Sequence, residues 1–295
     1  MRVLITGASG QVGSALYRSA PPGSQLQAMT RAELDIRDAP AVEAAVRAFA
    51  PQVIINAAAY TAVDRAEEES QLATAINAHG PAALARAAHA RPGCRLLHIS
   101  TDYVFDGRAT RPYQPQDRPN PLSVYGRSKL QGEQAVTEQL GERAVILRTA
   151  WVYAAEGKNF LLTMLRLMRE RGAVRVVADQ LGTPTAADSV ARALWVVASR
   201  PDIRGILHWT DAGTESWCGF ATAIAQEAQA AGLVSVIPQV TAIATADYPT
   251  RAHRPANSVL DTASTSTLLG ITPCPWRTNL RATVAMIASA GRTSS

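Results

Sequence analysis

Short apolar runs alternate with stretches of helical periodicity through the first half of the chain. The stretches at 39–49 and 125–140 recur with the spacing of amphipathic helices. The apolar runs predict strands at residues 2–6, 26–29, 51–56, 95–99 and 144–148. Regular alternation of this kind predicts an α/β protein with a Rossmann-type, doubly wound parallel sheet covered by helices on both faces.

The pattern loosens after residue 150. Residues 241–259, which contain two prolines, predict a long loop. The remaining stretches predict short strands at 174–177 and 205–209 and helices at 159–171, 188–199, 216–231, 263–269 and 276–288. We therefore expect a Rossmann domain over 1–150 and a smaller α/β substrate-binding domain over 151–295, with some elements of about 174–209 returning to the first domain.

Composition narrows the class of protein. The chain has 295 residues, 47% of them hydrophobic and 18% charged, with no apolar run near the length of a membrane span and no signal-peptide pattern, so we expect a cytoplasmic protein without membrane contact. Three scattered cysteines and five separated histidines predict no metal site. The net charge of +5 is dispersed and only 5% of residues are aromatic, which argues against nucleic acid and suggests an anionic cofactor and an anionic small substrate.

Three glycines follow the first predicted strand. Gly7, Gly10 and Gly13 stand between that strand and a helix-compatible segment, where bare backbone and a helix N-terminus favour the pyrophosphate of a dinucleotide. The alternative is an ordinary strand-to-helix turn. Thr30-Arg31 ends the second strand, and an arginine there accommodates a 2′-phosphate, which favours NADPH. Asp35 either accepts a hydrogen bond from adenine or caps the next helix.

Tyr125 and Lys129 lie four residues apart in a predicted helix and therefore on one face. A phenol needs a nearby cation to exchange its proton near neutral pH, and a lysine one turn away supplies one. The alternative is a packed tyrosine and a solvated lysine. Thr101 follows the strand at 95–99, where its hydroxyl is able to hydrogen-bond the same substrate oxygen as Tyr125.

The chain resembles the extended short-chain dehydrogenase/reductase family over nearly its full length. Seven segments carry the resemblance in order: 7–13, 56–64, 100–105, 124–129, 148–153, 179–185 and 248–260. Nucleotide-sugar dehydratases of this family carry Thr-Asp-Glu where this chain has Thr101-Asp102-Tyr103. The resemblance therefore implies reduction and not dehydration.

The resemblance implies roles for individual residues. Catalysis is assigned to Tyr125 and Lys129, with Lys129 also holding the nicotinamide ribose and lowering the pKa of Tyr125, and to Thr101. Cofactor contacts are implied for Gly7, Gly10, Gln11, Val12, Gly13, Thr30, Arg31, Asp35, Ile36, Ala59, Tyr60, Thr61, Ile99, Tyr125 and Lys129. Substrate contacts are implied for Thr101, Asp102, Tyr125, Trp151, Arg254 and Asn257.

The implied reaction is NADPH-dependent reduction, with NADH also accepted, of the 4-keto group of dTDP-4-dehydro-6-deoxy-L-mannose to dTDP-L-rhamnose for cell-surface polysaccharide such as O-antigen. Two alternatives stay open: a reductase forming another dTDP-6-deoxyhexose, and a non-catalytic NADP-binding regulatory subunit. Some members of the family are metal-bridged dimers that use three glutamates, but here the matching positions are Ala15, Asp188 and a tail from Ser289 without a carboxylate side chain. We therefore expect no metal, and a monomer or a weak homodimer.

Overall fold

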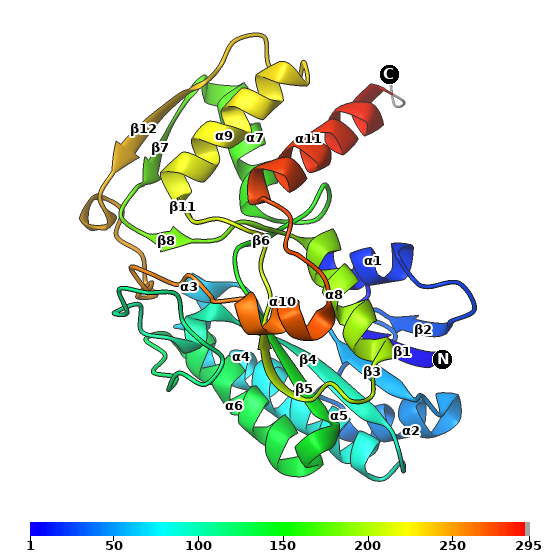
Figure 1. Cartoon of the computed structure of the whole chain (residues 1–295). Helices are drawn as coiled ribbons and strands as arrows, with labels where there is room; N and C mark the ends of the chain where they lie inside the picture. Colours follow the sequence, from blue (N-terminus) through cyan, green and yellow to red (C-terminus); the bar gives the residue numbers. More distant parts are fainter. Residues whose placement is uncertain (293–295) are drawn as a thin grey trace.

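A six-stranded parallel sheet forms the centre of the computed structural model, which describes residues 1–292 (Figure 1). The strands, in sheet order, are β10 (Gly205–His208), β5 (Ala144–Thr149), β4 (Arg95–Thr101), β3 (Val53–Asn56), β1 (Arg2–Thr6) and β2 (Gln25–Met29). Every neighbouring pair is parallel. The predicted doubly wound fold is confirmed, because β1 is the first strand in sequence and the sheet extends from it in both directions.

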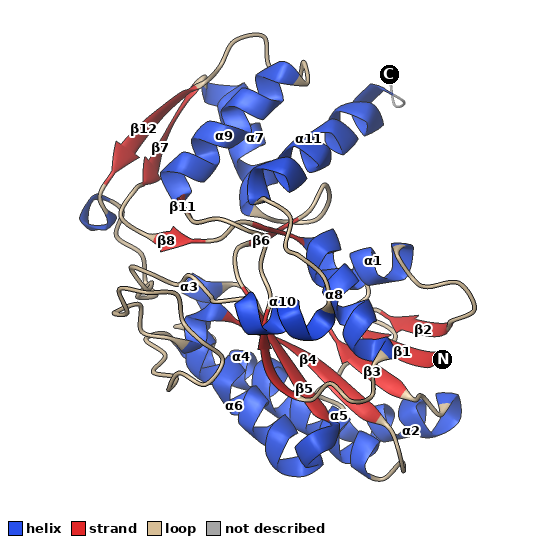
Figure 2. Ribbon diagram, viewed as in Figure 1, coloured by secondary structure: helices blue, strands red, loops and turns tan. Residues whose placement is uncertain are grey.

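Helices cover both faces of this sheet, and the alternation of side chains along each strand explains why. Val3 and Ile5 of β1 are buried on the face covered by α1 (Gln11–Arg18) and α8 (Ala187–Ser199), whereas Leu4 is buried on the opposite face. That opposite face is covered by α2 (Ala39–Phe49), α5 (Gly80–His89) and α6 (Val124–Leu140), as the blue helices in Figure 2 show.

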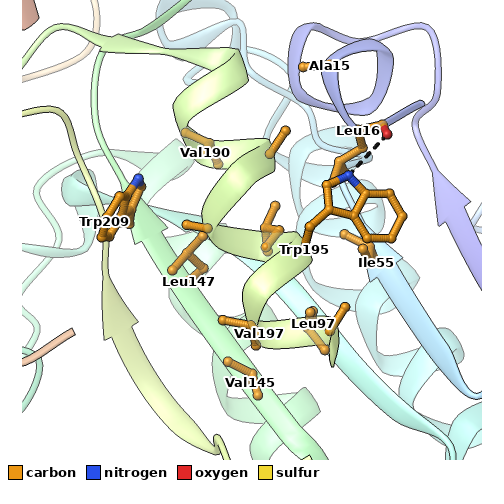
Figure 3. Packing of buried hydrophobic residues seen from close by; sticks show 14 of the residues in the cluster. Ala15, Leu16, Ile55, Leu97, Val145, Leu147, Val190, Trp195, Val197 and Trp209 are labelled. Carbon is orange, nitrogen blue, oxygen red and sulfur yellow. Dashed lines mark hydrogen bonds between the residues drawn. The ribbon is translucent and has the colours of Figure 1, made fainter. Parts of the chain in front are cut away.

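Helix α8 comes from the second half of the chain but packs on the large sheet. Its Trp195 donates a hydrogen bond from Nε1 to the backbone oxygen of Leu16 in α1, at 3.2 Å (Figure 3). Val190 and Val197 of α8 lie against Leu147 of β5 and its neighbours in the same buried cluster. This packing fixes α1, and with it the glycine turn that precedes it.

A smaller unit stands above the carboxyl ends of the strands (Figure 1). It consists of β7 (Ala173–Val177) paired in parallel with β12 (Gln239–Ile243), together with α7 (Phe160–Arg171), α9 (Trp217–Ala230) and α11 (Trp276–Arg292). The elements between 174 and 209 thus divide between this unit and the large sheet. The prediction of a loop over 241–259 is wrong for residues 241–243. These residues belong to β12, which is stabilised by pairing with β7, a strand distant in sequence.

Shorter elements complete the described residues. The helical stretch before β4 is continuous, because α4 (Ser70–Thr74) and a π-helical turn, η1 (Ala75–His79), lead directly into α5. The other short elements are α3 (Val63–Ala66), α10 (Ala263–Leu269), β6 (Val152–Tyr153), β8 (Leu181–Gly182), β9 (Thr185–Ala186), β11 (Glu215–Ser216) and the 3-10 turns η2 (Asp102–Val104), η3 (Gly141–Arg143) and η4 (Thr245–Asp247).

Across residues 1–292, none of the helices has the length and apolar character needed to span a bilayer. Residues 293–295, at the end of the tail that begins at Ser289, lie outside the described residues.

Candidate active site

The glycine turn lies where the sheet order reverses, between the carboxyl ends of β1 and β3. Gly7 has a φ of 71°, which favours glycine, and a Cβ there would lie 2.6 Å from the backbone nitrogen of Ala58. At Gly13 a Cβ would collide with the backbone oxygen of Gly7. These two glycines therefore allow the turn and the close packing of α1 on the sheet, and the crevice beside them is where doubly wound folds bind ligands.

The N-terminus of α1 is open to a ligand. Gly10 precedes the helix, and no side chain caps its N-terminus. A Cβ at Gly10 would meet only the oxygen of Gly7, at 3.2 Å, so the outer side of the turn is clear for a close approach. Uncapped N–H groups at a helix N-terminus and missing side chains are the two features that a pyrophosphate requires.

The side chains of Gln11 and Val12 turn away from this opening. Gln11 donates to the backbone oxygen of Val152 at 3.4 Å and accepts from Asn159 at 2.9 Å. Val12 packs against the buried cluster under α8. Only the backbone N–H groups of these two residues are therefore placed to serve an anion.

Arginine and carboxylate side chains surround the end of β2. Glu33 accepts hydrogen bonds from the backbone N–H and the hydroxyl of Thr30, both at 2.8 Å. Arg31 is largely exposed, and its Nε lies 3.9 Å from the carboxylate of Asp35. Arg37 binds that carboxylate at 3.0 and 2.5 Å, and this hydrogen bonding lowers the pKa of Asp35 to about 2. The exposed guanidinium of Arg31 remains available to a phosphate.

The structure shows the surroundings of Asp35 and Ile36, whose cofactor contacts stay predictions. The helix-cap alternative for Asp35 is wrong, because Asp38 caps α2 by accepting from the N–H of Ala41 at 3.0 Å. Ile36 is buried, and a Cβ on Gly80 would lie 2.5 Å from its Cδ1. The Ile36 side chain therefore packs in the protein core.

The segment after β3 forms the wall of the crevice. Ala59 and Thr61 are exposed, and Tyr60 is half-buried between them. Asn77 holds the backbone of Tyr60 by accepting from its N–H at 2.8 Å and donating to its oxygen at 3.0 Å. The Tyr60 hydroxyl donates to Glu69 at 2.5 Å, which raises the pKa of that phenol.

Helix α6 brings Tyr125 and Lys129 together, as their spacing predicts. Ser123 caps the helix by accepting from the N–H of Gly126 at 3.1 Å, which places Tyr125 in the first turn. Both side chains are buried, Tyr125 with 8% and Lys129 with 2% of its surface exposed. The alternative of a solvated surface lysine is therefore wrong.

Burial dominates the acidity of Tyr125. It raises the pKa of the phenol to about 12, a hydrogen bond with the Thr101 side chain acts in the opposite direction, and the charge of Asp102 adds to the rise. Lys129 is not among these three effects, so its role as the cation that lowers this pKa stays a prediction. At neutral pH Tyr125 keeps its proton, as a proton donor must.

Asp102 carries an oxygen without a partner. It is buried beside Thr101, whose hydroxyl donates to its Oδ1 at 2.9 Å, whereas its Oδ2 has no hydrogen-bond partner in the described structure. Burial raises the pKa of this carboxyl to about 6, and hydrogen bonds with Ser258 and Thr101 offset part of the rise. An unpartnered buried oxygen beside Thr101 suits a sugar hydroxyl.

Lys129 is held by the strand beside it. Its Nζ donates to the backbone oxygen of Ile99 at 2.6 Å and lies 3.3 Å from Nε2 of His98. Burial lowers its pKa to about 8, although the carboxylate of Glu133 on the same helix acts to raise it. The lysine is therefore an ammonium at neutral pH that loses its proton more readily than an ordinary lysine.

A cavity of about 850 Å³ adjoins this cluster on the side of the smaller unit. Tyr103 connects the two, since it lines the cavity and its ring packs edge-on against Tyr125 with centroids 5.7 Å apart. The cavity has an apolar wall that includes Phe160 and Met164, and cationic side chains at Arg171, Arg175 and Arg254. Apolar and cationic groups together suit a nucleotide with a base and phosphates.

Trp151 does not present two free faces. Its indole stacks on Trp217 with centroids 3.5 Å apart, and a Cβ on Gly182 would collide with it. Its φ of 45° is unusual for a residue other than glycine. Trp217 lines the cavity, and the role of Trp151 as a sugar platform stays a prediction.

Arg254 and Asn257 have different surroundings. Arg254 lines the cavity and binds the carboxylate of Asp64 through two hydrogen bonds, at 3.1 and 2.6 Å. Asn257 donates to the oxygen of Ala109 at 2.8 Å and accepts from the N–H of Val259 at 3.1 Å. Its amide thus holds two loops together, and its predicted substrate contact remains a prediction.

Sequence reasoning missed His98, Tyr103 as a cavity residue, and Trp217. His98 lies within an apolar strand, and a histidine buried there needs a hydrogen-bond partner, which is the signal that could have identified it. Trp217 carries no local signal, because it reaches the site only through the packing of α9 on α7.

The chain is similar to known proteins over nearly its full length. A family model described as the RmlD substrate binding domain matches residues 1–289. A dTDP-4-dehydrorhamnose reductase of Aggregatibacter actinomycetemcomitans is 43% identical over 287 residues, which are 95% of this chain and 97% of that protein.

Two solved structures are similar to nearly the whole chain. A dTDP-4-dehydrorhamnose reductase from Clostridium acetobutylicum has a TM-score of 0.91 at 36% identity, covering 97% of this chain and 99% of its own. The enzyme of that name from Bacillus anthracis, in complex with NADP, has a TM-score of 0.89 at 35% identity, covering 96% of this chain and 98% of its own.

Proposed function

Because this chain belongs to the RmlD substrate binding domain family, whose similar relatives are dTDP-4-dehydrorhamnose reductases, we propose that it reduces dTDP-4-dehydrorhamnose to dTDP-L-rhamnose with NADPH. It is an oxidoreductase of dTDP-rhamnose biosynthesis. The observation that carries this function is the buried group of Thr101, Tyr125 and Lys129 between an open glycine turn and a nucleotide-sized cavity.

The crevice at the end of β1 fits a dinucleotide. The uncapped N-terminus of α1 and the clear side of Gly10 favour the pyrophosphate, and the exposed Arg31 favours a 2′-phosphate. Ala59, Tyr60 and Thr61 line the remainder of the groove, with Lys129 and the backbone of Ile99 at its inner end. When bound there, NADPH supplies the hydride that the ketone carbon receives.

The protein's own residues manage the proton. Tyr125 is protonated at neutral pH and donates its proton to the carbonyl oxygen on which charge develops. The Thr101 hydroxyl donates a hydrogen bond to the same oxygen, turning from Asp102 to do so. Lys129 supplies a positive charge near the phenolate that remains.

The cavity and Asp102 hold the substrate. The free Oδ2 of Asp102 accepts a hydrogen bond from a sugar hydroxyl next to the reacting carbon. The dTDP portion lies in the cavity, with its base against the apolar wall and its diphosphate near Arg254. The N-terminal 150 residues thus serve chiefly the cofactor, and the later ones chiefly the nucleotide sugar.

We place the reaction in the cytoplasm, where NADPH and nucleotide sugars are available, and describe the enzyme as a monomer or weak homodimer. Two of the positions that match the metal-bridging glutamates support this oligomeric state. Ala15 is fully buried, and Asp188 accepts a hydrogen bond from Arg18 within the same chain.

One assay tests the function. The ketosugar is made in situ from dTDP-glucose by the preceding dehydratase and epimerase, and NADPH oxidation is followed after addition of this protein. We expect oxidation that depends on the ketosugar, slower oxidation with NADH, and dTDP-L-rhamnose as the product by NMR. Cofactor binding without turnover would instead identify a regulatory subunit, and a product of different configuration at C4 would identify a reductase for another 6-deoxyhexose.

A further inference from the structure

His98 is a fully buried histidine in the centre of β4, behind the catalytic lysine. None of its surface is exposed, and both ring nitrogens have polar neighbours. Its Nδ1 lies 3.0 Å from the side-chain nitrogen of Asn56, and its Nε2 lies 3.3 Å from Nζ of Lys129. Burial and the charge of Lys129 both lower its pKa, so His98 is neutral and carries a single proton.

The orientation of Asn56 decides which nitrogen carries that proton. The backbone N–H of Ala58 lies 3.1 Å from one end of the Asn56 amide, and a backbone N–H is only a donor, so this end is the oxygen. The Thr6 hydroxyl donates to the same oxygen at 2.8 Å. The NH₂ end therefore points at His98 and donates to Nδ1, which must be the unprotonated nitrogen.

The single proton of His98 then lies on Nε2 and points at Lys129. Two donors face each other across 3.3 Å when the lysine is an ammonium, whereas a neutral amine would accept the N–H as a hydrogen bond. The bond from Nζ to the oxygen of Ile99 keeps the lysine in this position. A close packing of helix and strand maintains the contact, because a Cβ on Gly132 of α6 would lie 3.4 Å from the same Nε2.

We propose that His98, held by Asn56 with its proton on Nε2, is a positioning residue that makes Lys129 release its proton readily to the Tyr125 phenolate. This inference rests on the proposed function, which it deepens. Tyr125 gives its proton to the new alkoxide, Lys129 passes a proton to the phenolate and becomes an amine, and the amine regains a proton from solvent. While Lys129 is an amine, the Nε2–H group of His98 donates a hydrogen bond to it, and His98 does not transfer its proton at any stage.

The titratable groups that act on Lys129 make opposing contributions. Glu133 on the same helix favours the ammonium, and His98 from β4 favours the amine. Tyr125, one turn earlier on α6, is the group that receives the proton. The pH dependence of the reaction therefore reports the burial of Lys129 together with the opposing effects of Glu133 and His98.

A second buried histidine provides an internal reference. His208 is also fully buried, and its Nδ1 lies 2.9 Å from the backbone oxygen of Tyr113. A carbonyl only accepts, so His208 carries its proton on Nδ1, leaving Nε2 to face Arg148 at 3.5 Å. The two buried histidines should have opposite tautomers.

The first experiment is a ¹⁵N NMR spectrum of the histidine rings in the wild-type protein, which needs no turnover. Protonated and unprotonated ring nitrogens have very different chemical shifts, so the tautomer is read directly. The variants His98→Asn and His208→Asn assign the two signals. We expect the Nε2–H form for His98 and the Nδ1–H form for His208; an Nδ1–H or doubly protonated His98 overturns the proposal, even if the protein reduces the ketosugar normally.

The second experiment measures the pKa of Lys129. In His98→Asn, the shorter amide still reaches Asn56 but no N–H faces the lysine, so the pKa of Lys129 should rise by about one pH unit. It is followed by the ¹³Cε shift of Lys129 without cofactor, and by the basic limb of kcat against pH with cofactor and ketosugar. His208→Asn should leave both unchanged, and a Lys129 pKa unaltered by His98→Asn contradicts the proposal.

Discussion

The guanidinium of Arg148 on β5 binds the carboxylate of Glu133 on α6 at 2.9 and 2.6 Å, one helical turn beyond Lys129. Both side chains are almost completely buried, with 1% and 4% exposed. Removing one partner leaves an uncompensated buried charge. We therefore expect Arg148→Met to lower the free energy of unfolding by about 3–5 kcal/mol, measured by urea denaturation.

The matched control replaces both charges. The double variant Arg148→Met, Glu133→Leu leaves no buried charge and should recover most of the lost stability. A double variant as unstable as Arg148→Met alone would mean that the loss arises from packing, for example of Arg148 over the ring of Phe105 at 5.1 Å.

Tyr125→Phe should abolish reduction while largely sparing NADPH binding. The phenol hydroxyl is the proposed proton donor, whereas the ring itself provides the packing against Tyr103. We expect kcat to fall by about 10²–10⁴-fold, as for loss of a general acid. Turnover is measured with the ketosugar and binding by NADPH fluorescence; near-normal turnover would refute the assignment.

Asp102→Asn tests the buried carboxyl through the pH dependence of stability. Its pKa of about 6 in the folded protein is above the ordinary value of 3.8, so the folded state holds this proton more tightly than the unfolded state. The resulting stabilisation is complete at low pH and is lost as the pH rises through 6. The asparagine variant lacks this loss.

We therefore expect the stability of Asp102→Asn relative to wild type to increase by about 3 kcal/mol between about pH 4 and pH 8, measured by urea denaturation. At the same time kcat/KM for the ketosugar should fall. The carboxylate offers only acceptor oxygens to the sugar hydroxyl, whereas the amide has an NH₂ donor in place of one of them. A relative stability that does not vary with pH would show that the pKa of Asp102 is ordinary.

Two neighbouring arginines test the substrate cavity. Arg254 lines the cavity, whereas Arg251 is exposed, pairs with Glu68 and is not among the cavity residues. Arg254→Met should weaken dTDP binding about tenfold, and Arg251→Met should leave it nearly unchanged. Calorimetry with dTDP measures both, and equal losses would indicate only a general effect of charge.

Much of the fold was predictable from local pattern. Helices over 39–49 and 263–269 have the bounds that the sequence predicts, as does the first strand. Strand β12 was missed, because Gln239–Ile243 is a partly exposed strand whose stability depends on pairing with β7. Local pattern indicates buried strands well, since their apolar runs are continuous, but exposed strands carry a weaker signal.

The candidate site divides in the same way. The sequence by itself determined the glycine turn and the Tyr125–Lys129 pair, because one requires bare backbone and the other requires only helical spacing. Only the tertiary structure decided what surrounds them: the burial that raises the pKa of Tyr125 and lowers that of Lys129, and the contact between His98 and Lys129. Desolvation and donor–acceptor geometry depend on residues from different strands and helices, which no local pattern brings together.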